Sequence, residues 1–101
     1  MMSFIYVIAA VHSECTGPVK LGLSNDPDRR VRQLQTGHAE ELHVFYRQPV
    51  EQDKVHLYER MLHRDNRHHR LRGEWFNMTV EHAICYVKLV LIEYDLEPAG
   101  T

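Results

Sequence analysis

The chain has 101 residues, of which 44% are hydrophobic and 26% charged. These values are typical of one globular domain and exclude a disordered or fibrous chain. The formal net charge of −2 at pH 7 argues against a strongly basic nucleic-acid binder. No apolar run is long enough to cross a membrane, and no signal peptide is evident. Cys15 and Cys85 lack the spacing of metal ligands or of a secreted disulfide framework, so we expect reduced thiols and a cytoplasmic location.

The charges are unevenly distributed. Residues 60–72 contain arginines and histidines with Asp65 as the only acid, a second basic group lies at residues 29–32, and the C-terminal part is acidic. Such a pattern fits either a basic face on an acidic molecule or an ordinary solvated surface, and the sequence does not decide between them.

Two strands are expected near the N-terminus. Residues 3–10 are rich in Phe, Ile, Tyr and Val, and residues 18–24 alternate apolar side chains with Lys20 and Gly22. The loop between them, residues 12–17, is short, which favours an antiparallel pair.

The first helix is expected to follow directly. Asp26 can cap it, and Pro27 suits the first helical position because no N–H is needed there. Val31 and Leu34 would face the core before Gly37 ends the helix.

Two more helices and one more strand complete the prediction. Residues 42–50 read as a third strand, residues 52–65 as an amphipathic helix, and Thr79 can cap a final helix after a basic, irregular segment at residues 66–73. The inward stripe of the middle helix would consist of Val55, Tyr58 and Leu62.

The order ββαβαα predicts a small α+β domain with a three-stranded, mostly antiparallel sheet flanked by helices. We expect one domain over residues 1–97 and a tail at 98–101.

The first candidate site residues lie on the two N-terminal strands. Tyr6 alone would usually be a core residue whose hydroxyl has a partner. Lys20 is more unusual, because lysine is almost never buried without a partner. It lies either on a solvated sheet face or at a binding site, where Gly22 on the same face would let a phosphate backbone approach closely.

Arginines follow at the start of the first helix. Arg29 and Arg30 would usually be solvated there, but guanidinium groups beside a helix N-terminus also form a good anion site.

The middle helix carries the third set. His56, Glu59 and His63 share one helical face. One reading is a zinc site made by all three. A single Glu59 carboxylate that holds Mg²⁺ or Mn²⁺ is chemically easier, and an exposed helix charge is the ordinary alternative.

A Gly73-Glu74-Trp75-Phe76 element follows the basic segment. Its two aromatic residues would close the sheet as a hydrophobic plug, with base stacking on Trp75 as a minor alternative.

Taken together, these residues resemble the GIY-YIG nuclease superfamily. Phe4-Ile5-Tyr6 is similar to its first motif and Lys20-Leu21-Gly22 to its second, with Phe4 in place of glycine and Lys20 in place of tyrosine. Arg30 and Glu59 match the helical arginine and the metal-binding glutamate. The stretches VKLGLSNDPDRRVRQLQTG, LYERMLH and GEWF are similar to a phage and bacterial branch of that superfamily.

The resemblance implies a metal-dependent endonuclease that cleaves DNA with one Mg²⁺ or Mn²⁺ on Glu59. Tyr6 would act as general base or position the water, Lys20 would lower its pKa, and Arg30 would stabilise charge on the phosphate. Gly22, Arg29 and His63 are further candidates for substrate contact or support. Specificity would come from a homodimer, a separate partner or the shape of the substrate, which could be single-stranded or branched.

Two alternatives remain open at this level. The chain could be a catalytically inactive relative that binds nucleic acid or protein, and its altered first motif and acidic net charge favour that reading. It could also be a zinc-stabilised interaction protein that uses His56, Glu59 and His63.

Overall fold

The computed structural model describes residues 2–10 and 17–96. The expected tail at 98–101, Cys15 and most of the expected loop at 12–17 lie outside these residues. The helices and strands are β1 (Met2–Ala10), β2 (Val19–Ser24), α1 (Pro27–Gln35), β3 (Leu42–Glu51), α2 (Val55–Asp65), the short 3₁₀ helix η2 (Arg67–His69), β4 (Arg70–Arg72), β5 (Trp75–Phe76) and α3 (Val80–Leu96).

The α+β class and the antiparallel sheet are confirmed, but the predicted number of strands is wrong. The sheet has five strands in the order β3-β1-β2-β5-β4, and not three. The two additional strands lie in the segment that was expected to be irregular and in the GEWF element. They are three and two residues long and are joined by a turn in which Gly73 has φ of +55°. Strands this short show no alternating pattern in the sequence.

The centre of the sheet is the antiparallel pair of β1 and β2, as expected from their short connection. Its register places Tyr6 opposite Gly22 and Ile8 opposite Lys20. On the other side of β1, β3 forms the edge of the sheet, where Pro49 can be accommodated.

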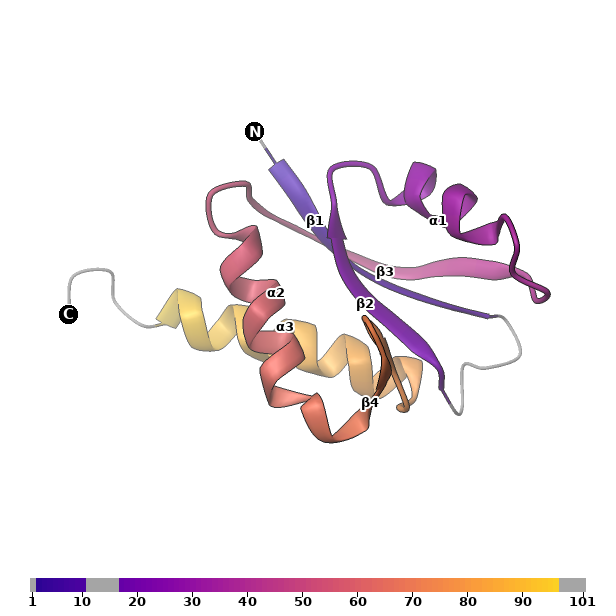
Figure 1. The fold of residues 1–101 in the computed structure, drawn as a ribbon. Helices are drawn as coiled ribbons and strands as arrows, with labels where there is room; N and C mark the ends of the chain where they lie inside the picture. The colour runs from indigo at the N-terminus through magenta and orange to yellow at the C-terminus, as the bar shows by residue number, and fades with distance from the viewer. Residues whose placement is uncertain (1, 11–16, 97–101) are drawn as a thin grey trace.

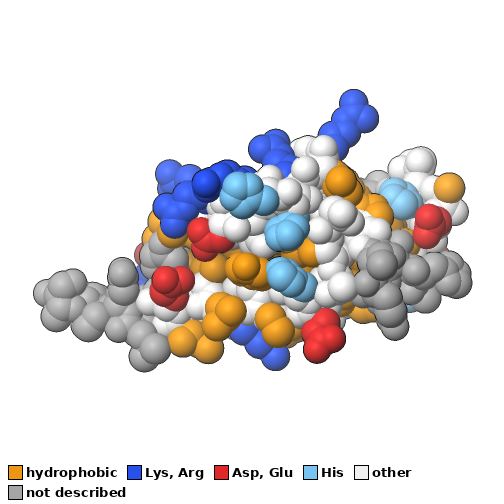
Figure 2. Space-filling model, turned by 90° about the horizontal axis from the view of Figure 1, so that it is seen from below, with side chains coloured by type: hydrophobic (Ala, Val, Ile, Leu, Met, Phe, Trp, Pro, Cys, Tyr) orange, Lys and Arg blue, Asp and Glu red, His pale blue; other side chains and the backbone are white. Residues whose placement is uncertain are grey.

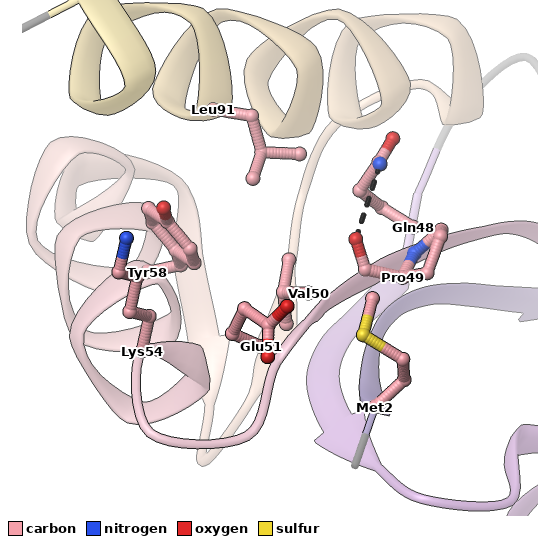
Figure 3. A pocket seen from close by; sticks show the side chains of 8 residues that line it. All are labelled: Met2, Gln48, Pro49, Val50, Glu51, Lys54, Tyr58 and Leu91. Atoms are coloured by element: carbon pink, nitrogen blue, oxygen red, sulfur yellow. Dashed lines mark hydrogen bonds between the residues drawn. The ribbon is translucent and has the colours of Figure 1, made fainter.

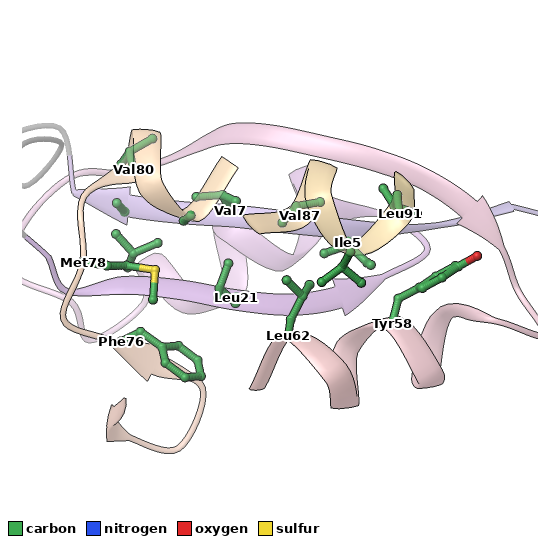
Figure 4. Packing of buried hydrophobic residues seen from close by; sticks show 14 of the residues in the cluster. Ile5, Val7, Leu21, Tyr58, Leu62, Phe76, Met78, Val80, Val87 and Leu91 are labelled. Atoms are coloured by element: carbon green, nitrogen blue, oxygen red, sulfur yellow. The ribbon is translucent and has the colours of Figure 1, made fainter. Parts of the chain in front are cut away.

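Helices cover both faces of the sheet (Figure 1). Helix α1 lies on one face, and α2 and α3 lie on the other. The face toward α2 and α3 carries the main core, which Figure 4 shows as interlocked side chains from β1, β2, α2 and α3. The expected inward stripe of α2 is confirmed, because Val55, Tyr58 and Leu62 are all buried.

A smaller core lies between the sheet and α1. It consists of Tyr6, Ile8, Ala10 and Leu42, and Val31 and Leu34 of α1 pack against it as predicted. Helix α1 is also tied to β3 by a bidentate ion pair.

In that pair, the Arg47 nitrogens lie 2.6 and 3.1 Å from the Asp28 carboxylate oxygens. The guanidinium lowers the pKa of Asp28 below its ordinary value.

The predicted caps of the first and last helices are present. The Asp26 carboxylate accepts a hydrogen bond from the backbone N–H of Arg29 at 3.1 Å, and the Thr79 hydroxyl accepts one from His82 at 3.0 Å. Helix α2 begins at Val55 and not at residue 52, and Lys54 before it provides no side-chain cap. Over the described ranges, no helix combines the length and the apolar character needed to span a lipid bilayer.

Candidate metal and phosphodiester site

The site lies at the edge of β2, next to the start of β5, where the pairing of the two strands stops. Strand β5 pairs with β2 only at Val19 and Lys20, and one more backbone bond follows, from the Leu21 N–H to the Glu74 carbonyl at 3.1 Å. Beyond this bond, side chains of α2 contact the backbone of β2 in place of β5. His63 Nε2 lies 2.9 Å from the Leu21 carbonyl oxygen, and the Glu59 carboxylate accepts a hydrogen bond from the backbone N–H of Leu23.

The spacing of the two α2 residues explains why both reach the same strand edge. Residues four apart on a helix are separated by about 6 Å along its axis, and residues two apart on a strand by about 6.7 Å. Glu59 and His63 therefore match Leu23 and Leu21. Since a carbonyl can only accept, His63 Nε2 is the N–H donor, and Nδ1 keeps the free lone pair in the neutral ring.

Glu74 joins these two residues. One ligand atom each from Glu59, His63 and Glu74 lies within 4.8 Å of the others, and among the described residues this is the group that could hold a metal ion. Two carboxylates and an imidazole suit Mn²⁺, and Mg²⁺ accepts the carboxylates with water in the other positions. His56 is not a member, so the group differs from the His56-Glu59-His63 zinc site considered from the sequence.

The environment of Glu59 disfavours its charge when no metal is present. Burial raises the pKa of Glu59 above its ordinary value, and the nearby Glu74 carboxylate raises it further. His63, His56 and the Leu23 N–H partly oppose this shift. A cation between the carboxylates would remove the repulsion, which is the electrostatic condition for a metal site.

Lys20 lies beside the group and is not on a solvated face. It is 6% exposed, its Nζ lies 3.1 Å from Glu74 Oε2, and it stands 5.4 Å from the centre of the Trp75 ring. Glu74 is the residue that the sequence analysis missed. A buried lysine in an apolar strand requires a partner. Lys20 alone could therefore have indicated an acidic neighbour.

Tyr6 reaches the site from β1. It is 1% exposed, and its ring end fills the space above Gly22, where a Cβ atom would come within 2.6 Å of Tyr6 Cζ and 3.0 Å of Glu74 Oε2. Tyr6 therefore fills the space above Gly22. This space is not open to a phosphate, contrary to our expectation. The missing side chain of Gly22 instead lets the Tyr6 hydroxyl lie next to the carboxylates.

The pKa of Tyr6 is raised, first by burial and then by the charges of Glu74 and Glu59. A hydrogen bond from Arg30 opposes this shift. Lys20, which was expected to lower this pKa, is not among its causes. Arg30 is thus the cation that contacts the phenol.

The other predicted residues are placed less centrally. Arg29 is exposed on α1, and its guanidinium has no polar partner in the parts of the chain that the structure describes. Phe76 is fully buried, which confirms the plug, whereas Trp75 is half-buried and stacks on His38 with 5.8 Å between ring centres.

A separate hollow lies away from this site, where the end of β3 meets α2 and α3 (Figure 3). Its walls combine Met2, Pro49 and Leu91 with Glu51 and Lys54. None of the residues that form the site at β2 lines it.

Residues 3–91 match the model of the T5orf172 domain, a domain found in phage and bacterial endonuclease-like proteins and associated with nuclease-like and DNA-binding functions. No curated protein and no solved structure matches the chain. The match covers nearly the whole sequence, and the chain belongs to the T5orf172 domain family.

Proposed function

We propose that the chain is a divalent-metal-dependent endonuclease that hydrolyses phosphodiester bonds in DNA, with a site of the GIY-YIG type. The observation that carries the proposal is the convergence of four distant segments on the edge of β2. Tyr6 of β1, Arg30 of α1, Glu59 and His63 of α2, and Glu74 before β5 contribute a phenol, a guanidinium and metal ligands to one place.

The family membership and the register of the sheet both support this reading. The two segments that resemble GIY-YIG motifs are neighbouring antiparallel strands, and their central residues, Tyr6 and Gly22, lie opposite each other. The two segments that resemble the motifs together are therefore also neighbours in the fold.

Glu59, with Glu74 and His63 beside it, would hold Mg²⁺ or Mn²⁺. When bound, the ion supplies positive charge that polarises the phosphate and stabilises the leaving oxygen. Lys20 pairs with Glu74 and so holds this carboxylate at the site.

Arg30 and Tyr6 provide the remaining chemistry. The Arg30 guanidinium stabilises negative charge that develops on the phosphate oxygens. Because its pKa is raised, Tyr6 is a neutral phenol at neutral pH. Of the two roles that the sequence suggested for it, orienting the attacking water by a hydrogen bond fits this state better than removing a proton.

The test is a cleavage assay with plasmid and single-stranded DNA in Mg²⁺, Mn²⁺ or chelator. We expect metal-dependent cuts by the wild type and none by Glu59→Gln, because the amide keeps the shape but loses the charge that a divalent ion requires. Glu81→Gln, the same change at an exposed position of α3, should cut like the wild type. Normal cutting by a folded Glu59→Gln sample would remove Glu59 as the metal ligand.

A non-catalytic nucleic-acid-binding module is the second candidate. The ion pair of Lys20 with Glu74 favours it, since each residue of this pair satisfies the other's charge without a substrate or metal. DNA binding by the wild type without cleavage in either metal would establish this alternative.

A further inference from the structure

A strongly basic surface runs from the outer side of α2 through η2 to β4. Residues 60–72, which form it, contain five arginines and Asp65 as their only acid, in a chain whose net charge is −2. All five are exposed. We call them the basic surface: Arg60, Arg64, Arg67, Arg70 and Arg72. Figure 2 shows Lys and Arg side chains along the upper edge of one face of the molecule, with histidines between them and a band of hydrophobic side chains.

Most of this charge is not neutralised by neighbours. Arg64 lies 3.5 Å from Asp65, and Arg67 donates to the Arg64 carbonyl at 3.4 Å. Within residues 2–10 and 17–96, the guanidinium groups of Arg60, Arg70 and Arg72 have no ion pair or hydrogen bond. By contrast, Arg47 on β3 is held by both oxygens of Asp28. Unpaired arginines at this density repel one another, so they need a reason other than stability.

Both ends of the basic surface lie within two residues of a carboxylate of the proposed metal site. Arg60 follows Glu59 directly in α2. Arg72 precedes Glu74 by two residues and lies opposite Trp75 in the pairing of β4 with β5. A polyanion that lies along this surface therefore passes the proposed site.

The composition of the surface indicates how it would bind. Residues 60–72 contain no Phe, Tyr or Trp, the rings on which unpaired bases stack best, and their only exposed rings are the imidazoles of His68 and His69. Exposed guanidinium groups are well suited to bidentate contacts with phosphate oxygens, which position a duplex without reading its sequence.

We propose that the basic surface binds the phosphate backbone of double-stranded DNA beside Glu59 and Glu74 and does so independently of sequence. This inference takes from the proposed function only that DNA is the ligand.

The experiment measures fluorescence anisotropy with a labelled 30-base-pair duplex in chelator, where no cleavage occurs, over a series of salt concentrations. The test variant is Arg70→Gln/Arg72→Gln, and the control is Lys54→Gln/Lys88→Gln, which removes the same charge from exposed positions elsewhere. A melting curve shows that each variant is folded.

We expect the test variant to bind at least about tenfold more weakly at equal salt and to lose about two units of the slope of log K against log salt, since each phosphate contact contributes about 0.9. The control should keep the wild-type slope, and two duplexes of unrelated sequence should bind equally. Equal slopes for the test and control variants would overturn the assignment of the surface. Tighter binding of a single strand of equal length would overturn the assignment of double-stranded DNA as the ligand.

This result is separable from the proposed catalysis. If binding depends on the basic surface but no metal supports cleavage, the inference stands and the nuclease proposal fails. If the wild type cleaves but the test variant binds and cleaves normally, the nuclease proposal stands and the inference fails.

Discussion

The two faces of the sheet bury different chemistry. The face toward α2 and α3 carries the larger hydrophobic cluster, whereas the face toward α1 has a small cluster and buries Tyr6 and Lys20 beside Gly22. The side chains of Glu59 and Glu74 meet these residues at the edge of β2. One face is thus a conventional core, and the other combines polar groups with little apolar area to support them.

This difference separates the origin of stability from the origin of function. Apolar burial stabilises a fold in proportion to area, whereas burying a charged or polar group costs free energy unless it is paired. The raised pKa values of Tyr6 and Glu59 are signs of that cost at the β2 edge. We therefore expect changes in the large core to affect stability, and changes at the β2 edge to affect activity first.

The largest effect should come from Tyr6→Phe. It keeps the buried ring and removes only the hydroxyl, so cleavage should fall by about 10²-fold or more, the usual cost of losing the orientation of a reacting group. Tyr86→Phe on α3 is the matched control and should leave the rate unchanged. Single-turnover rates measure the effect, and DNA binding should persist. A Tyr6→Phe protein that still cuts well would make Tyr6 an ordinary core residue.

The large core provides the contrasting change, Leu91→Ala. Leu91 belongs to the main core on the inward side of α3 with 9% of its surface exposed, and truncation should cost about 2–5 kcal/mol in the free energy of unfolding. Leu89→Ala on the same helix, where 57% of the side chain is exposed, should cost much less. Urea unfolding gives both values. Cleavage per folded molecule should stay the same for both, and a large loss of rate in Leu91→Ala would contradict the separation.

The sequence predicted the parts of the fold that have long periodic patterns. Strand β1, the caps at Asp26 and Thr79 and the inward stripe of α2 depend on residues that are close in the sequence. Strands β4 and β5 were not predicted because a two- or three-residue strand is stabilised by its neighbours and not by its own pattern.

Several residues of the candidate site could be named from the sequence, but their contacts could not. Tyr6, Arg30 and Glu59 were named from their motifs, but the pairing of Lys20 with Glu74 depends on how β5 meets β2. Pairings between segments more than fifty residues apart are not encoded in any local pattern.

Gly22→Ala should have a smaller effect, and it should lower both the stability and the cleavage rate. The added Cβ would meet the ring end of Tyr6, which is fully buried and cannot move aside freely. Overpacking of this kind costs about 1–3 kcal/mol. Because Tyr6 must shift, the rate per folded molecule should also fall, unlike in Leu91→Ala. Unfolding and single-turnover cleavage measured on the same sample check both parts, and a stable, fully active Gly22→Ala would show that the close contact is unimportant.

The smallest effect is the change in stability of Glu59→Gln without metal. Whether this variant is more or less stable than the wild type tests the role of Glu59. Burial and Glu74 raise the pKa of Glu59 above its ordinary 4.5, so the folded state binds its proton more tightly than the unfolded state. This contribution to stability is fully present below pH 4.5 and is lost as the pH rises through the folded pKa.

At pH 7 in chelator, Glu59 therefore destabilises the fold, and Glu59→Gln should melt at a higher temperature than the wild type. The amide can still accept the Leu23 hydrogen bond, and the difference should shrink as the pH falls to 4.5. Glu81→Gln should change little at either pH. Adding Mn²⁺ should reverse the order, because an ion that binds only the folded wild type raises its melting temperature and leaves the variant unaffected. A lower melting temperature for Glu59→Gln in chelator would mean that Glu59 is a structural contact of β2 and not a carboxylate kept for a metal at the expense of stability.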